Sequence, residues 1–90
     1  MRIALMAHDK PGALQTRLDN RTAHLAYIQD TGVVEQAGPL LDGEGAMIGS
    51  LIILEVADMA AAENWAANDP YAGAGLFSNV TLTVWNRVIG

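Results

Sequence analysis

The segment from Ala46 to Val56, AMIGSLIILEV, contains the apolar run Leu51-Ile52-Ile53-Leu54. A continuous apolar run of this kind is typical of a β-strand that is covered on both faces, and it is far too short to span a bilayer. The segment therefore predicts a central strand, and the rest of the chain is interpreted relative to it.

Three further segments carry the signals of strands. Residues 2–8 alternate along the chain, although both of their faces are fairly apolar. Residues 33–41 predict a second strand, which the pair Gly38-Pro39 restricts to a sheet edge or a bulge. Near the end of the chain, Val80, Leu82 and Val84 alternate with polar or larger residues and predict a final strand.

A long helix is predicted after the turn sequence Asp9-Lys10-Pro11-Gly12. Its apolar residues recur at helical spacing and form one stripe, which we expect to pack on the sheet: Leu14, Leu18, Leu25 and Ile28. Gly32 is expected to end this helix, because glycine readily adopts the left-handed conformation that follows a helix.

The segment 59–68 predicts a second, alanine-rich helix. Asp58 occupies the position of an N-cap residue, and Pro70 disfavours helical geometry at Asp69, so the helix should stop there. Residues 70–75 are expected to form a turn or a single helical turn.

The resulting order β-α-β-β-α-β predicts one α+β domain over residues 1–90, with the ferredoxin-like arrangement of two helices on one face of a four-stranded antiparallel sheet. Strands 2–8 and 46–56 are apolar on both faces, so the second face of the sheet also needs a covering surface. We expect a homodimer through this sheet face, or a larger oligomer, because one sequence then supplies both halves of the contact.

Composition excludes several classes of protein. Ten acidic residues against five basic residues give a formal charge of −5, which argues against binding to nucleic acid or to an anionic membrane. Cysteine is absent, so neither a disulfide framework nor a thiolate metal cluster is expected. No signal peptide is recognised, and we expect a cytoplasmic protein.

Polar residues interrupt the apolar pattern of the first helix. Arg17, Arg21 and His24 follow at spacings of four and three residues and therefore lie on one helix face. Two interpretations remain open. The arginine stems can lie along apolar surface while their charged heads reach solvent, with the histidine as a packing residue. Alternatively, the three side chains border a binding site beside the sheet.

Asp69, at the end of the second helix, also has two interpretations. A carboxylate there faces the negative end of the helix dipole, which is unfavourable. Asp69 can cap the next helical turn, with Pro70 as its first residue. It can also orient a histidine ring and so fix the tautomer of that ring. The two roles are compatible, since a carboxylate has two oxygens.

Fragments along essentially the whole chain resemble the YCII-related domain family. In order, they are Asp9-Lys10-Pro11-Gly12, Arg17-Leu18, Arg21-Thr22-Ala23-His24-Leu25, Ala37-Gly38-Pro39-Leu40, Gly49-Ser50, Ala66-Ala67-Asn68-Asp69-Pro70-Tyr71 and Ala74-Gly75-Leu76-Phe77. Their order, spacing and coverage make the match specific.

The resemblance implies a dimeric α+β barrel built from ferredoxin-like protomers. It also implies a histidine and an aspartate paired in a cleft for acid–base chemistry, at positions His24 and Asp69. The better understood members resemble lyases that act on small ring compounds without a cofactor. His8 departs from the family pattern, where a smaller or aromatic residue is expected. It would alter proton exchange if it pointed into the cleft.

These residues suit the abstraction of a proton next to a carbonyl group. Arg21, together with Arg17, could hold a carboxylate or enolate oxygen, and Ser50 and Tyr71 could add hydrogen bonds.

A metal site formed by His8, Asp9 and His24 has no ligand motif to support it. No cofactor is expected.

The expected function is therefore that of a cofactor-independent lyase or isomerase acting on a small oxygenated molecule, with His24 as the base and Asp69 orienting it. One alternative is a non-catalytic module that binds a small anion through Arg21 and His24. Another is a structural domain whose sheet face docks on a larger protein.

Overall fold

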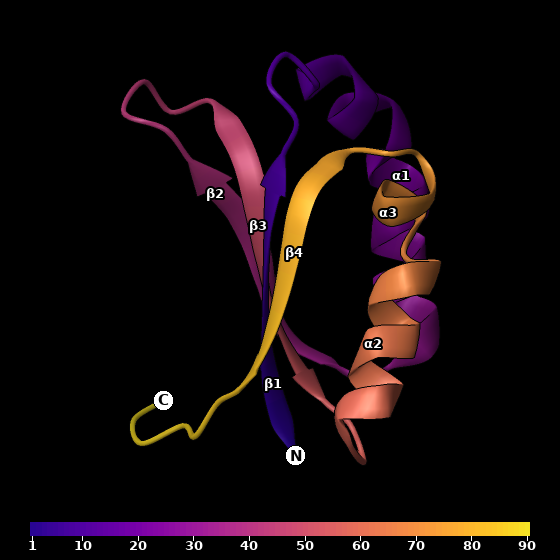
Figure 1. Ribbon diagram of the computed structural model, residues 1–90, viewed down its shortest axis with the longest axis vertical. Coiled ribbons are helices and arrows are strands. Elements are labelled where there is room, and N and C mark those ends of the chain that lie inside the picture. The colour runs from indigo at the N-terminus through magenta and orange to yellow at the C-terminus, as the bar shows by residue number, and fades with distance from the viewer.

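The computed structural model describes residues 1–90 and has the predicted order of elements (Figure 1). Of the two forms expected for residues 70–75, it has the single helical turn, over Pro70–Gly73. The final strand begins at Phe77, three residues before the predicted start at Val80. The elements are β1 Arg2–Asp9, α1 Leu14–Thr31, β2 Val34–Leu41, β3 Met47–Glu55, α2 Met59–Asn68, α3 Pro70–Gly73 and β4 Phe77–Val84.

The four strands form one antiparallel sheet in the order β2-β3-β1-β4. Strand β3 is internal, as its apolar run predicts, and β2, which contains Gly38-Pro39, lies at an edge. The helices all lie on one face of the sheet, and we call this the covered face (Figure 1). This is the ferredoxin-like α+β fold of the dimeric α+β barrel proteins. No helix combines the length and the apolar character that crossing a membrane requires.

Local signals explain where the helices begin and end. Asp58 caps α2 by accepting a hydrogen bond from the backbone N–H of Ala61 at 2.8 Å. Gly32 follows α1 in the left-handed conformation, with φ of 65°. A residue with a side chain rarely adopts that conformation, so glycine suits this turn into β2.

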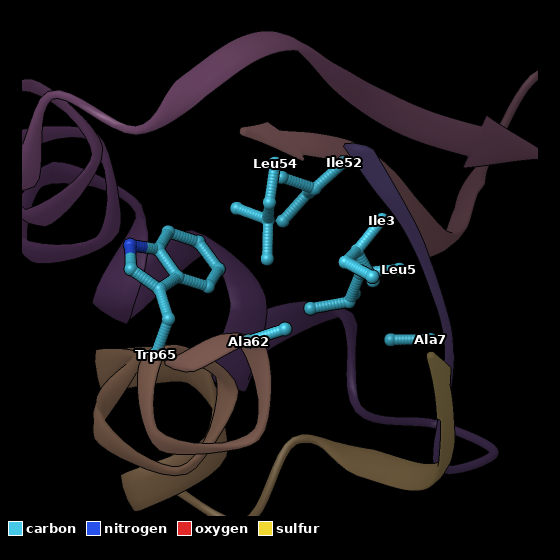
Figure 2. Close-up of a cluster of buried hydrophobic side chains, with 7 residues drawn as sticks. All are labelled: Ile3, Leu5, Ala7, Ile52, Leu54, Ala62 and Trp65. Carbon is cyan, nitrogen blue, oxygen red and sulfur yellow. The ribbon is translucent and has the colours of Figure 1, made fainter. Parts of the chain in front are cut away.

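The apolar core lies between the covered face and α2 (Figure 2). Trp65 ties the two long helices together, because its indole N–H donates to Thr31 Oγ1 at 2.9 Å and its carbonyl accepts from the Tyr27 hydroxyl at 2.8 Å. The core residues are Ile3, Leu5, Ala7, Ile52, Leu54, Ala62 and Trp65.

The expectation for the apolar stripe of α1 was wrong for most of its length. Leu14, Leu18 and Leu25 are 43%, 46% and 45% exposed, whereas Arg17 and His24 are the buried residues of this helix. The physical reason is that both buried polar side chains find carboxylate partners outside the helix, Asp9 and Asp69, which offset the cost of burying them. The row that contains them therefore faces inward.

The other face of the sheet, which we call the open face, carries no helix (Figure 1). Met6 of β1 and Leu51 of β3 are opposite one another in the strand register, and each is 39% exposed. Apolar residues thus lie on both sides of the central strands, as the sequence predicted. The open face leaves apolar surface uncovered in a single chain.

Candidate active site

His24 of α1 and Asp69, which links α2 to α3, are in direct contact. His24 Nδ1 lies 2.8 Å from Asp69 Oδ1, and both side chains are buried. The other ring nitrogen, Nε2, has no partner in the protein. Every fully buried side-chain nitrogen or oxygen has one, so Nε2 reaches accessible space. His24 lines a pocket, and Nε2 is therefore the ring atom available there.

Asp69 makes both of the contacts that the sequence left open, one with a histidine and one with the next helical turn. The same oxygen, Oδ1, contacts His24 and accepts a hydrogen bond from the backbone N–H of Tyr71 at 3.0 Å. This second bond caps α3, with Pro70 at its first turn. The helix cap therefore holds the carboxylate against the histidine ring.

Tyr71 lies between two cationic or basic side chains. Its ring stacks on the ring of His24, with centroids 3.9 Å apart and planes 14° from parallel. The guanidinium carbon of Arg17 lies 4.8 Å from the centroid of the same ring. Burial raises the pKa of Tyr71 above its ordinary value, against the opposing charges of Arg17 and Arg21. The phenol therefore stays protonated and can donate a hydrogen bond.

Arg17 forms a buried ion pair with Asp9, at the end of β1. Its Nε and Nη2 donate to the two carboxylate oxygens at 2.7 and 2.8 Å, and Nη2 also donates to Ser50 Oγ at 2.9 Å. Burial in itself lowers the pKa of Arg17, but the hydrogen bonds and charge of Asp9 outweigh it, and the net pKa lies above the ordinary value. Arg17 is therefore a fixed cation that also holds Ser50.

These groups converge on one cavity of about 150 Å³ between α1 and the covered face. Arg21 is the exposed cation of its lining, whereas Arg17 and Ser50 are each 3% exposed. Half of the lining is apolar. The lining residues are Arg17, Arg21, His24, Leu25, Ile28, Ala37, Gly38, Pro39, Met47, Ser50, Ile52 and Tyr71.

The structure brings together six of the seven residues that the sequence singled out: Arg17, Arg21, His24, Ser50, Asp69 and Tyr71. His8 lies apart from them. It is exposed on the open face, beside Gly49 and Asn79 of the neighbouring strands, and it does not line the pocket.

Sequence reasoning missed the role of Asp9, which it assigned to a turn. The available signal was an acidic residue where the first strand ends, eight positions before an arginine on the inward helix row. The metal site considered for His8, Asp9 and His24 is not assembled, since no three histidine or carboxylate side chains gather at one place.

Two comparisons with proteins of similar sequence cover nearly the whole chain. The protein YciI of Escherichia coli O6:H1 is 36% identical over 98% of this chain and 99% of that protein. An uncharacterised protein of Haemophilus influenzae is 32% identical over the same shares of the two chains.

Solved structures give the same fold. The 5-chloro-2-hydroxyhydroquinone dehydrochlorinase of Burkholderia phenoliruptrix AC1100, in complex with 2,5-dihydroxybenzoquinone, is 33% identical and superposes with a TM-score of 0.89 over 96% of this chain and 94% of that one. An antibiotic biosynthesis monooxygenase, 14% identical with a TM-score of 0.60 over 98% of each chain, shares the fold alone.

The YCII-related domain model matches residues 1–86. Together with the identity to YciI over the full length, this match agrees with the fragments noted in the sequence. The chain belongs to the YCII-related domain family.

Proposed function

We propose that this protein is a cofactor-independent enzyme of the lyase type that acts on a small oxygenated ring compound. His24 is the general base, and Asp69 orients it. The observation that carries the proposal is the 2.8 Å contact between His24 Nδ1 and Asp69 Oδ1, which leaves Nε2 unpaired in a pocket.

The contact with Asp69 determines which nitrogen can accept a proton. An ionised carboxylate can only accept hydrogen bonds, so Nδ1 carries the hydrogen and the lone pair belongs to Nε2. Stacking on Tyr71 fixes the plane of the ring as well. Asp69 also stabilises the imidazolium that forms once Nε2 has taken a proton.

The size of the cavity supports a ligand with a single ring. Its volume is about 150 Å³, and an engineered cavity of about this volume in another protein binds benzene. The apolar part of the lining, including Leu25, Ile28 and Ile52, suits the body of a ring, and the polar groups suit its substituents.

The reaction we propose begins with the transfer of a proton from the ligand to His24 Nε2. The electron pair that held this proton stays on the ligand and is delocalised onto a ring oxygen. It then expels a substituent from the neighbouring carbon, and the products are the leaving anion, the unsaturated ring and imidazolium. Imidazolium returns its proton to solvent or to the leaving group.

The similarity to a dehydrochlorinase supports this kind of chemistry. That protein acts, by its title, on a chlorinated hydroxyhydroquinone, and this chain is 33% identical to it over nearly its full length. The similarity favours hydroxylated rings as the first compounds to test.

The test is turnover of hydroxylated aromatic and lactone substrates by the wild type and by His24→Ala and Asp69→Asn. General-base catalysis contributes about 10²- to 10⁴-fold, so both variants should lose activity on this scale. Asp58→Asn is the matched control, because Asp58 caps α2 and contacts no histidine. Equal turnover in all variants would remove the histidine and the aspartate from the mechanism. Binding without turnover in the wild type would instead support the non-catalytic module.

We propose as well that a second copy of the chain covers the open face. Met6 and Leu51 expose apolar surface there, opposite one another in the register. The two-fold contact of one such face with another makes this surface inaccessible to water. Sedimentation of the dilute protein should then give twice the mass of the chain.

A further inference from the structure

The buried serine of the pocket has a proton without an acceptor. Ser50 Oγ accepts a hydrogen bond from Arg17 Nη2 at 2.9 Å, so its oxygen is already engaged as an acceptor. Its own hydroxyl hydrogen has no acceptor in the protein, although Ser50 is only 3% exposed and lines the pocket. The hydrogen is therefore available to an oxygen atom of a ligand.

The hydroxyl of Tyr71 is in the same situation. The Arg17 guanidinium beside it has only donors and can only donate to its oxygen, and Tyr71 lines the pocket, so the phenolic hydrogen is available to a ligand there. Burial raises the pKa of Tyr71, and the group is a neutral donor. Ser50 and Tyr71 are thus two uncharged donors in the buried part of the lining, which we call the floor of the pocket.

The charges of the pocket differ between the floor and its exposed rim. At the floor, the carboxylate of Asp9 neutralises Arg17 through two hydrogen bonds. At the rim, Arg21 is exposed and belongs to none of the salt bridges of the protein. The floor therefore offers donors without net charge, and the rim offers a free positive charge.

We propose that the pocket selects a ring with two oxygen functions of different charge. An uncharged acceptor oxygen, such as a carbonyl, binds Ser50 and Tyr71 at the floor, and an ionised oxygen binds Arg21 at the rim. This inference rests on the proposed function and extends it to the class of substrate. Negative charge develops on the floor oxygen when His24 removes a proton, and the two donors stabilise that charge.

The two subsites have different kinetic signatures. Donors that strengthen their bonds as charge develops act on kcat, and loss of one such donor costs about 10²- to 10³-fold. Ser50→Ala should therefore lower kcat by this factor and raise KM by a much smaller one. A cation that holds an ionised group equally in the ground state and the transition state acts on KM. Arg21→Gln should raise KM about tenfold or more with kcat nearly unchanged.

Equilibrium binding tests the same assignment without turnover. The probes are 2,5-dihydroxybenzoquinone, which carries carbonyl oxygens and ionisable hydroxyl groups on one ring, and hydroquinone, which is uncharged at neutral pH. The wild type should bind the first at least about tenfold more tightly, as a hydrogen bond to a charged group predicts. Arg21→Gln should abolish this preference. Ser50→Ala should weaken binding of the quinone, and Ser50→Thr, which keeps a hydroxyl, should restore it.

Ser78→Ala is the matched serine control, since Ser78 is exposed and does not line the pocket. Thermal melts of each variant show whether it is folded. The assignment is overturned if the wild type has no preference between the probes, if Arg21→Gln keeps the preference, or if Ser50→Ala binds and turns over as the wild type does. If the preferences hold while His24→Ala retains full turnover, the subsites stand and the proposed base is wrong.

Discussion

On the covered face of the sheet, Arg17, His24, Ser50 and Asp69 are buried, whereas the open face leaves Met6 and Leu51 each 39% exposed. A sheet with one face in water normally has only apolar residues under its helices and polar residues on its outer face. Here buried polar residues accompany the apolar core, and the outer face is partly apolar. Both the buried polar side chains on the helix side and the exposed apolar side chains on the open face therefore need a physical explanation.

The difference between the faces teaches that each departure has its own cause. On the covered face every buried polar side-chain atom has a partner, so the polar groups are held as a network around a pocket. On the open face no helix covers the sheet, and Met6 and Leu51 remain exposed in a single chain. The covered face thus borders a pocket, which we propose binds a ligand, and the open face leaves apolar surface, which we propose a second copy covers.

The largest effect should follow from breaking the ion pair of the covered face. Asp9→Asn leaves the Arg17 cation buried without its counter-charge, and such a change costs about 3–5 kcal/mol of the free energy of unfolding. Urea denaturation at a fixed protein concentration measures this loss. Replacing both partners, Asp9→Leu with Arg17→Met, should recover most of it, since apolar residues can substitute for a buried pair.

Glu35→Gln is the control for this comparison. Glu35 pairs with Arg2 at 2.6 Å, but the side chains are 27% and 33% exposed, and ion pairs in such positions contribute little. The midpoint of its urea transition should stay at the wild-type value. A loss as large as that of Asp9→Asn would show that burial does not distinguish the two pairs.

The next largest effect should come from a charge on the open face. Leu51→Lys would place an unpaired cation in the proposed contact between two copies, which costs about 3 kcal/mol, or roughly a hundredfold in the dissociation constant of the dimer. Leu18→Lys is the matched change on helix α1, where the leucine is 46% exposed against 39% for Leu51. Sedimentation should detect dissociation for the first variant only. If only Leu18→Lys dissociates, the contact lies on the helix side.

The smallest expected effect is a change in the free energy of unfolding at high pH, and it comes from the two tyrosines of the chain. Both contact residues on the helix side of the sheet. Burial raises the pKa of Tyr71 and of Tyr27, and the charge of Asp69 adds to the shift in both. Above about pH 10 the unfolded chain therefore loses tyrosine protons that the folded protein keeps. The free energy of unfolding is unaffected below that pH and falls as pH rises through the folded pKa values.

Absorbance of tyrosinate during a pH titration measures this shift. The folded protein should form tyrosinate at higher pH than the urea-unfolded protein, and Tyr71→Phe should remove only the part due to Tyr71. Titration of both phenols at the ordinary value in the folded state would contradict the burial described for them.

The fold could be predicted well because its signals are local. The apolar run of β3, the cap at Asp58 and the glycine at position 32 each specify a strand or a helix end without reference to the rest of the chain. The orientation of α1 could not be predicted in this way. Its leucine stripe and its arginine row have similar spacing, and the choice between them depends on two carboxylates outside the helix, Asp9 and Asp69.

The site shows the same division. The contact of His24 with Asp69 was expected from the family resemblance, and the structure contains it. The pairing of Arg17 with Asp9, and hence the engagement of Ser50, required coordinates because strand β1 and helix α1 must pack before those atoms meet. His8 could not be placed either, since strand alternation alone does not say which face the helices cover.

One oxygen of Asp69 contacts the imidazole Nδ1 and accepts a hydrogen bond from the first backbone amide of α3, and the ring of Tyr71 stacks on the same imidazole. Residues 69–71 thus combine three contacts in one turn: they hold the His24 Nδ1 atom, begin a helix and stack on the imidazole ring. An insertion there would disturb all three together. Ala37, Pro39 and Met47 also line the cavity and take no part in these contacts. Substitutions there can change the shape of the cavity without disturbing the turn at residues 69–71.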